Sequence, residues 1–253
     1  MERLVAIVGQ LIVEIAADEV GEQGGRHMLA NTRIIPGGRS YRQALYAKQH
    51  GYSSILLGRI GDDHYGKLIL DSLNGLGIST QFIDVSKSEY TGISFEVKRL
   101  LDGAECIYFD PGASTGAGNF QYPIQNYLTL CDAIFINQWV HRALSAKVLE
   151  LAAQNSIPTV YVCSTPPQGM PFAVDYLLIE SGCDAEGIEA GSLQVKKGLF
   201  LWQRGELSAF MPDGDRVYKL KLNKDWNGDF LAIRLMRTLS GNAKLEETGR
   251  LVG

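Results

Sequence analysis

The sequence predicts an α/β protein with a mostly parallel central sheet. Two short apolar runs, residues 4–8 and 54–58, each finish at or beside a glycine, which is typical of strands buried on both faces. Apolar residues at helical spacing over residues 40–50 and 65–73 alternate with these runs. This alternation indicates crossover helices between parallel strands. The 253 residues, 45% of them hydrophobic, are enough for one large domain with a substantial core.

A candidate ligand contact and a candidate hinge lie between the first strand and the first helix. Residues 11–17 are mostly apolar but include one acid, Glu14. Open α/β sheets place ligand contacts just past the ends of their strands, so Glu14 is a candidate contact; a partly exposed strand residue is the alternative. Residues 21–25 hold three glycines and are expected to form a loop, and residues 28–35 a returning strand. The Gly-Gly pair at 37–38 is a candidate hinge before the helix.

The middle of the chain predicts a hairpin outside the main sheet. Residues 90–98 and 105–109 alternate between apolar and polar side chains, and a turn is expected at 101–103 between them. Such a hairpin suits a flap over a site. We also expect a turn at 60–63, before the second helix, and a loop of small residues at 111–118.

Alternation of strands and helices then returns. Strands are expected at 133–137, 159–163, 176–179 and 199–202, a helix at 145–154, and a turn at 212–215.

The stretch from Lys224 to Phe230 predicts a tight turn that opens a helix. The first-turn N–H groups of a helix lack partners within it and lie at the positive end of its dipole, so an anion such as phosphate suits that position. Asp229 falls in this turn, where a carboxylate can take a proton from an attacking alcohol. The alternative is structural, because Asp is common in first helical turns for dipole reasons alone.

Charge and cysteine usage exclude several classes of protein. The net charge of -4 and the lack of a basic run argue against a nucleic-acid binder. No apolar run reaches membrane-spanning length, and the quickly polar start is not expected to be a signal peptide. Of the four cysteines, none lies in a C-x-x-C pair or at metal spacing with His, and Cys131 and Cys163 are expected to be buried thiols. A cytoplasmic location is therefore predicted.

The motifs resemble those of the ribokinase-like, or PfkB, family of carbohydrate and nucleoside kinases. The segment Gly37-Gly38-Arg39-Ser40-Tyr41-Arg42-Gln43-Ala44 is similar to its Gly-Gly-x-x-x-Asn-x-Ala motif. Residues 58–66 are similar to its G-x-[VI]-G-x-D-x-x-G segment, and Gly77-Ile78 with Thr91-Gly92 to its G-[VI]…T-G pattern. Trp226-Asn227-Gly228-Asp229 occupies the place of Gly-Ala-Gly-Asp. The resemblance implies one three-layer α/β/α ribokinase-like domain over residues 1–253, with a small β lid from about 11–35 and 90–110.

The resemblance also implies a reaction, namely transfer of the ATP γ-phosphoryl group to a hydroxyl of a small, sugar-like substrate. Asp229 would be the base, and Trp226, Asn227 and Gly228 would form the anion hole. Substrate contacts would come from Glu14, Gly37, Gly38 and Arg42. Mg²⁺ would shield the phosphates, although no residue is assigned as its ligand. The lid of this family often pairs two subunits, so a homodimer is plausible.

Arg42 departs from the family pattern on the substrate side, because it stands where the family has Asn. A cation there favours a substrate with a phosphate or carboxylate; the alternative is that Arg42 faces solvent or an acid on the lid.

The nucleotide side departs further. The family's Asn-x-x-Glu motif has no Asn near Glu180, so Glu180 or Glu186 would have to replace its charge. The Thr-x-Gly-x-x-Gly segment is reduced to Lys196-Lys197-Gly198, which leaves Lys197 and Gly198 as the nucleotide-binding candidates.

The segment that contains the expected anion hole also departs from the family pattern. Trp226 adds an indole at a position where the family has glycine. Only 24 residues follow Asp229, whereas the family usually continues through further helices.

Two functions therefore remain open. The first is a working sugar-type kinase with an unusual nucleotide pocket. The second is a catalytically weak or inactive kinase-like protein that binds a small polar ligand or a partner. A dinucleotide-binding enzyme is less suitable because no G-x-G-x-x-G follows the first strand, and a serine hydrolase lacks its G-x-S-x-G motif.

Overall fold

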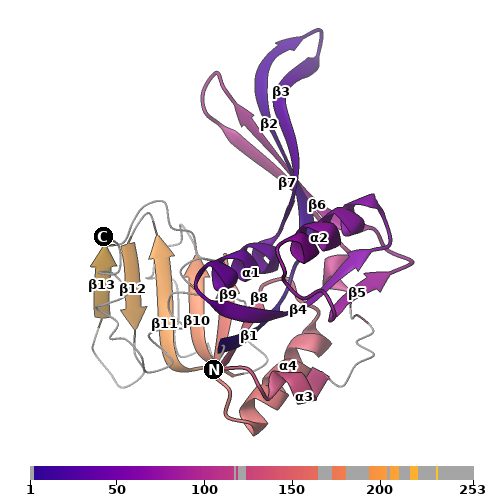
Figure 1. Ribbon diagram of the computed structural model, residues 1–253. Coiled ribbons are helices and arrows are strands. Elements are labelled where there is room, and N and C mark those ends of the chain that lie inside the picture. The colour runs from indigo at the N-terminus through magenta and orange to yellow at the C-terminus, as the bar shows by residue number, and fades with distance from the viewer. Residues whose placement is uncertain are drawn as a thin grey trace.

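The computed structural model of the protein describes residues 3–116, 118, 124–164, 173–180, 194–203, 206–210, 217–221 and 232. A nine-stranded sheet forms the centre, in the order β13-β12-β11-β10-β9-β8-β1-β4-β5 (Figure 1). Its strands are β1 (Arg3–Val8), β4 (Tyr52–Gly61), β5 (Ile83–Ser86), β8 (Ala133–Asn137), β9 (Thr159–Cys163), β10 (Val174–Glu180), β11 (Val195–Gln203), β12 (Glu206–Phe210) and β13 (Val217–Lys221). Neighbours run parallel except at β11–β12 and β12–β13. The predicted α/β class with a mostly parallel central sheet is confirmed.

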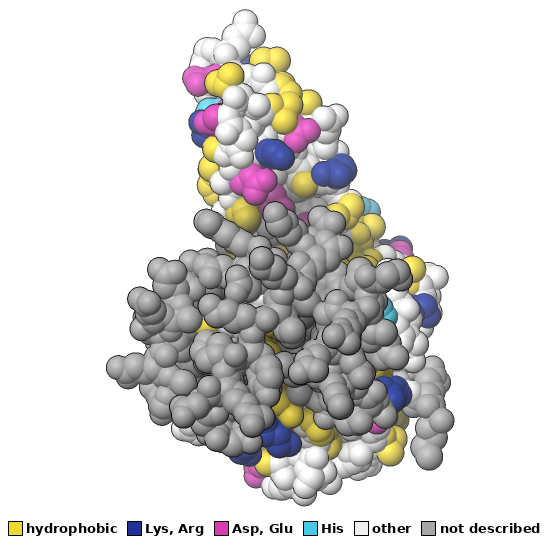
Figure 2. All heavy atoms as spheres, turned by 90° about the vertical axis from the view of Figure 1, so that its left-hand side faces the viewer, with side chains coloured by type: hydrophobic (Ala, Val, Ile, Leu, Met, Phe, Trp, Pro, Cys, Tyr) yellow, Lys and Arg dark blue, Asp and Glu magenta, His cyan; other side chains and the backbone are white. Residues whose placement is uncertain are grey.

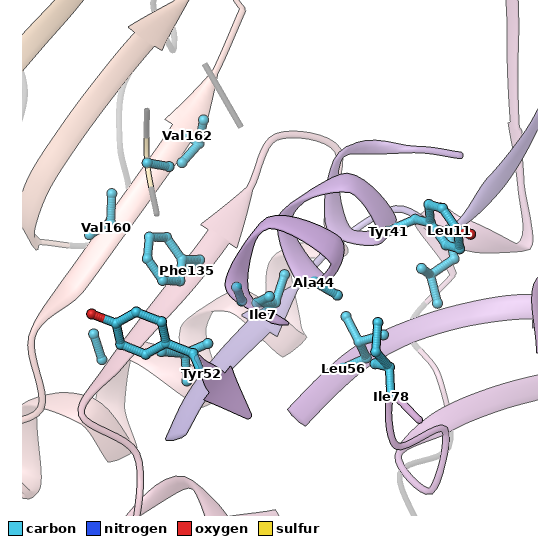
Figure 3. Close-up of a cluster of buried hydrophobic side chains, with 14 of the residues drawn as sticks. Ile7, Leu11, Tyr41, Ala44, Tyr52, Leu56, Ile78, Phe135, Val160 and Val162 are labelled. Carbon is cyan, nitrogen blue, oxygen red and sulfur yellow. The ribbon is translucent and has the colours of Figure 1, made fainter. Parts of the chain in front are cut away.

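Helices cover both faces of the central sheet. They are α1 (Arg39–Gln49), α2 (His64–Gly75), α3 (Ile124–Leu128) and α4 (Arg142–Gln154), with a 3-10 turn, η1, at Ala113–Thr115. Because side chains alternate along a strand, Val5 and Ile7 of β1 pack in the core with α1 and α2, and Ala6 and Val8 in the core with α3 and α4. Figure 3 shows the first core, where Ala44 of α1 lies beside Ile7. The result is a three-layer arrangement of helices, sheet and helices.

A second, four-stranded sheet projects from this body (Figure 1). Its order is β3-β2-β6-β7, from β2 (Ile12–Gln23), β3 (Arg26–Gly37), β6 (Thr91–Arg99) and β7 (Glu105–Gly112). The pairs β2–β3 and β6–β7 are antiparallel, whereas β2 and β6 are parallel. The predicted hairpin of residues 90–98 with 105–109 is confirmed by the β6–β7 pairing.

Three predicted connections differ from the structure. The expected loop at 21–25 shrinks to a turn at Gly24 and Gly25, because two glycines with φ of 60° and 74° suffice to close a hairpin. The expected turn at 60–63 begins later, since β4 continues to Gly61 through its pairing with β5. Part of the expected loop at 111–118 has regular structure, as the end of β7 and η1.

The described cysteines are all free thiols. Cys106 is exposed, and Cys131 and Cys163 are buried, which confirms the expectation for these two. Burial raises the pKa of Cys131 and of Cys163 to about 12, so both stay protonated at neutral pH. Within the described ranges, none of the helices has the length and apolar character needed to cross a membrane.

Candidate active site

A buried amide network fixes the start of α1 over the carboxyl end of the sheet. Asn137, the last residue of β8, donates from Nδ2 to Ser40 Oγ at 3.0 Å and to Gln43 Oε1 at 2.9 Å. Gln43 Nε2 donates back to Asn137 Oδ1 at 2.9 Å. Gly9, just after β1, packs tightly here, because a Cβ on it would lie 2.5 Å from Ser40 Oγ. Buried polar groups paired in this way hold one geometry, so α1 begins directly beside the ends of β1 and β8.

Glu14 lies where β2, the Gly-Gly pair and α1 meet. Its Oε1 accepts a hydrogen bond from the Gly38 amide at 3.0 Å and another from Arg42 Nη1. Gly38 has φ of 89°, and a Cβ there would lie 2.7 Å from the Gln10 carbonyl oxygen. A Cβ on Gly37 would overlap the Glu14 carboxyl group. The structure therefore brings together the four substrate-binding candidates, Glu14, Gly37, Gly38 and Arg42. Gly37 makes room for the acid, and Gly38 lets the backbone pass close to Gln10 with a positive φ.

Arg42 faces an acid on the small sheet, since its ion-pair partner Glu14 belongs to β2. This arrangement agrees with the structural alternative for Arg42. Its guanidinium charge is already balanced by a carboxylate, which does not favour a second anion at the same place.

Sequence reasoning missed Arg39, the first residue of α1. Its Nη1 donates to Glu180 Oε2 at 2.9 Å and its Nη2 to Ser164 Oγ at 2.9 Å. Only 12% of its side chain is exposed. Glu180 ends β10 and Ser164 follows β9, so Arg39 connects α1 to the ends of two further strands. The sequence feature that could have identified Arg39 is its position directly after the Gly37-Gly38 pair.

The described residues do not build a magnesium site. Glu180, one candidate for the missing Asn-x-x-Glu charge, is paired with Arg39. In the part of the chain that the structure describes, no group of three or more His, Cys, Asp or Glu side chains is placed to hold a metal ion. Glu186 lies outside the described residues.

The nucleotide-binding candidates lie apart from Glu14 and Arg42. Lys197 and Gly198 are near the amino end of β11, whereas Glu180 marks the carboxyl end of the parallel neighbour β10. Lys197 Nζ pairs with Asp175 Oδ1 at 3.1 Å, at the amino end of β10. Their nucleotide role stays a prediction. The anion-hole candidates Trp226, Asn227 and Gly228 and the proposed base Asp229 lie outside the described residues.

Asp63 has a structural position at the start of α2. Its carboxylate accepts from the Gly66 amide at 2.7 Å, as the N-cap of α2. It also accepts from the Thr91 amide and the Thr91 hydroxyl, each at 2.7 Å. Burial raises the pKa of Asp63, but these hydrogen bonds outweigh burial and leave the pKa below its usual value. Asp63 thus ties α2 to the first residue of β6 as an ionised carboxylate.

The fold defines the class of protein. A putative ribokinase from Agrobacterium tumefaciens matches with a TM-score of 0.80 and 16% identity, over 98% of this chain and 88% of that chain. Ribokinase from Arabidopsis thaliana, solved with ribose and ATP, matches with a TM-score of 0.79 and 17% identity, over 99% of this chain and 90% of that chain. The protein has the ribokinase-like α/β fold, as predicted.

The family follows from the sequence. Residues 2–184 match the profile of the pfkB family of carbohydrate kinases, and the chain belongs to that family. Ribokinase from Bacillus subtilis strain 168 is 26% identical over 114 residues. That alignment spans 44% of this chain and 38% of the relative, well under two thirds of its length.

Proposed function

We propose that the protein is an ATP-dependent kinase that phosphorylates a hydroxyl group of a sugar-like substrate. The observation that carries this proposal is the Glu14 carboxylate, held by the Gly38 amide and Arg42 where α1 meets the end of the sheet. A fixed carboxylate at this edge can accept hydrogen bonds from sugar hydroxyls. The fold neighbour solved with ribose and ATP supports the same two substrates for this chain.

In the proposed reaction, Asp229 takes the proton of the substrate hydroxyl. The hydroxyl oxygen forms a bond to the γ-phosphorus of ATP, the bond from that phosphorus to the bridging oxygen breaks, and ADP leaves. The backbone at Trp226, Asn227 and Gly228 would hold the charge of the transferred group at the positive end of the helix that the sequence predicts to follow them. Mg²⁺, when it accompanies the nucleotide, supplies charge shielding for the phosphates.

The decisive experiment is a transfer assay with ATP, Mg²⁺ and a panel of sugars, on the wild type and on Asp229→Asn. Removing a general base typically costs about 10²–10⁴-fold in rate, so the variant should lose most of its activity. Glu14→Gln should weaken sugar binding instead, as a higher KM. An unchanged rate in Asp229→Asn would remove the base from the mechanism.

The alternative function, a kinase-like protein that binds a small polar ligand or a partner with little transfer, is favoured by one observation. Glu180, which would replace the charge of the missing nucleotide motif, is engaged by Arg39. Thermal shift separates the two functions, because any ligand that binds the native state raises its melting temperature. A shift with sugars but none with ATP or ADP would support the alternative.

We further propose that the chain acts as one domain in the cytoplasm and that the small sheet is its lid and its dimer interface. The register gives this sheet a face opposite Glu14, on which Ile34, Ile15, Phe95 and Tyr108 form one cross-strand row. Ile34 is 49% and Tyr108 64% exposed. A cavity of about 270 Å³ lies on the same sheet, lined by residues that include Leu29, Phe95, Val97, Cys106 and Tyr108. Exposed apolar surface of this kind suits a second copy.

A further inference from the structure

A cavity of about 230 Å³ lies at the amino ends of β9, β10 and β11, at the edge of the central sheet opposite to the Glu14 site. Thr159, the first residue of β9, and Asp175, the second residue of β10, both line it. The Asp175 carboxylate accepts from the Thr159 amide at 3.0 Å and from the Thr159 hydroxyl at 3.2 Å. These bonds fix the orientation of the acid in the wall of the cavity.

A β-bulge places two consecutive lysines opposite this acid. The pairing of β10 with β11 moves from 174 with 195 to 176 with 198, so β11 holds one more residue than β10 at this point. Lys196 and Lys197 therefore both stand opposite Asp175. Consecutive strand residues normally point to opposite faces, but both lysines line the same cavity. Bulges are rare between parallel strands and often lie beside functional sites, where they redirect a side chain.

The lysines give the cavity wall a net positive charge. Lys197 Nζ forms an ion pair with Asp175 Oδ1 at 3.1 Å. Asp175 is the only acid among the described residues that line the cavity, and within the described ranges Lys196 forms no ion pair. One ammonium group therefore lacks a counter-charge, which an anion would supply. Lysine binds phosphate and carboxylate groups as a point charge.

The last turn of α4 forms the opposite wall and leaves room for a ligand. It contributes the small side chains of Ala152, Ala153 and Ser156. The carboxyl end of a helix is negative, which by itself opposes an anion. Here the carbonyl oxygens of Ala152 and Ala153 accept hydrogen bonds from the amides of Ile157 at 2.9 Å and Ser156 at 3.3 Å. The end of α4 is therefore capped, which reduces the negative charge that it presents to the cavity.

We propose that this cavity is a second binding site, which takes the phosphate or carboxylate group of a small effector molecule. Lys196 and Lys197 would bind the anion, and Asp175 would hold Lys197 in position. The ligand is not the sugar-like substrate, because the five residues of β9, about 16 Å of strand, separate the two edges of the sheet. The inference is independent of the proposed function, since anion binding at this edge requires neither a sugar nor phosphoryl transfer.

The experiment is calorimetric titration of the full chain with inorganic phosphate and with malonate, in the absence of sugar and nucleotide. Lys196→Gln should weaken binding about three- to tenfold, because a charged hydrogen-bond donor is lost at a partly solvated position. Ala153→Leu should weaken it as well, because leucine fills the cavity while both lysines remain. Glu14→Gln should leave it unchanged. Tighter binding of phosphate would assign a phosphorylated effector, and tighter binding of malonate a dicarboxylate.

Lys147→Gln is the matched control for the loss of charge. Lys147 is an exposed residue of α4 that does not line the cavity, so this variant should bind both anions like the wild type. Lys196 is exposed too, and the melting temperatures of both variants should stay close to that of the wild type.

Three results would overturn the anion site. The first is absence of binding by both probes at millimolar concentration. The second is equal weakening by Lys196→Gln and Lys147→Gln, which would indicate general attraction by surface charge. The third is binding that Lys196→Gln and Ala153→Leu leave unchanged, because the anion would then bind elsewhere, for example at the expected anion hole before Asp229. None of these results would count against the proposed function, which the transfer assay tests separately.

Discussion

The Glu14 side chain is only 17% exposed, so its carboxylate needs partners that replace water. The Gly38 amide and the Arg42 guanidinium provide them. A carboxylate held from two directions keeps a fixed orientation, which is what a hydroxyl acceptor in a binding site requires. We therefore propose that Arg42 positions Glu14.

Arg42→Ala should weaken binding of neutral and phosphorylated sugars to a similar degree. Hydrogen bonds to charged groups contribute about 1.5–3 kcal/mol, and the partial exposure of Arg42 reduces this, so we expect a loss of about tenfold. Arg42→Lys should retain part of this affinity, because lysine keeps the positive charge but lacks the planar guanidinium group. The measurement is calorimetry with each ligand. If only phosphorylated ligands lose affinity, Arg42 instead binds an anionic group of the substrate.

Asp63→Asn should destabilise the protein by about 1–2 kcal/mol, because the amide keeps only one acceptor oxygen and leaves a Thr91 donor without its partner. The folded-state pKa of Asp63 is lowered, so its contribution is fully present above the unfolded value of about 3.9. The contribution is lost as the pH falls through the lower folded pKa. Urea titrations should therefore give a constant difference between wild type and variant from pH 5 to 8 and a shrinking one below about pH 4. Asp62→Asn, at the exposed neighbour, is the control and should show no such difference.

At the scale of elements, α1 begins under unusual electrostatic conditions. Its first turn holds no acidic residue, and its N-cap residue Gly38 provides no side-chain hydrogen bond. Arg39 and Arg42 stand in this turn, where the helix dipole opposes positive charge. Each arginine forms an ion pair with an acid from another element: Arg39 pairs with Glu180 of β10, and Arg42 pairs with Glu14 of β2. The two ion pairs thus offset the poor local start of α1 and tie it to both sheets.

Glu180→Gln should lower stability measurably, because Arg39 would lose the Glu180 carboxylate while it stays beside the positive end of the helix dipole. Arg39 is mostly buried, so we expect a loss of about 1–3 kcal/mol in urea unfolding. The control is Asp102→Asn, which breaks the exposed pair with Arg99 and should cost less than about 0.5 kcal/mol. A loss no larger than that of the control would mean that the Arg39–Glu180 pair does not anchor α1.

The length of an element decides how well the sequence predicts it. The buried strands β1, β8 and β9 follow from their apolar runs, because burial on both faces leaves a clear pattern. The four residues of β5 and the five of α3 were missed, since short elements depend on their neighbours rather than on a period of their own.

The site shows the same division between local and long-range information. The glycine-rich motif and the acid after the first strand are local patterns, and they mark Glu14, Gly37, Gly38 and Arg42 as substrate-binding candidates. Which groups these residues meet could not be predicted, because the Arg42–Glu14 and Arg39–Glu180 pairs join elements far apart in sequence. These contacts depend on the register between distant strands, which turns and packing determine.

At the scale of the whole molecule, we propose different roles for the two faces of the small sheet. It projects from the body, and its visible side in Figure 2 carries hydrophobic side chains among acidic and basic ones. Glu14, Ile35 and Ser94 lie on one face, and the row that contains Ile34 lies on the other. A partner that covers the Ile34 face would leave the Glu14 face available for substrate.

Ile34→Asp should therefore convert a dimer into a monomer, because a charge placed in an apolar interface loses its water without gaining a partner. The matched control is Ile35→Asp, on the same strand and equally exposed, at 47% against 49%, but pointing to the opposite face. Sedimentation velocity should give a dimer for the wild type and for Ile35→Asp, and a monomer for Ile34→Asp. Sugar binding should respond in the opposite way, since Ile35 is the cross-strand neighbour of Glu14. A monomeric wild type, or a dimer that both substitutions leave intact, would mean that the small sheet does not join two copies.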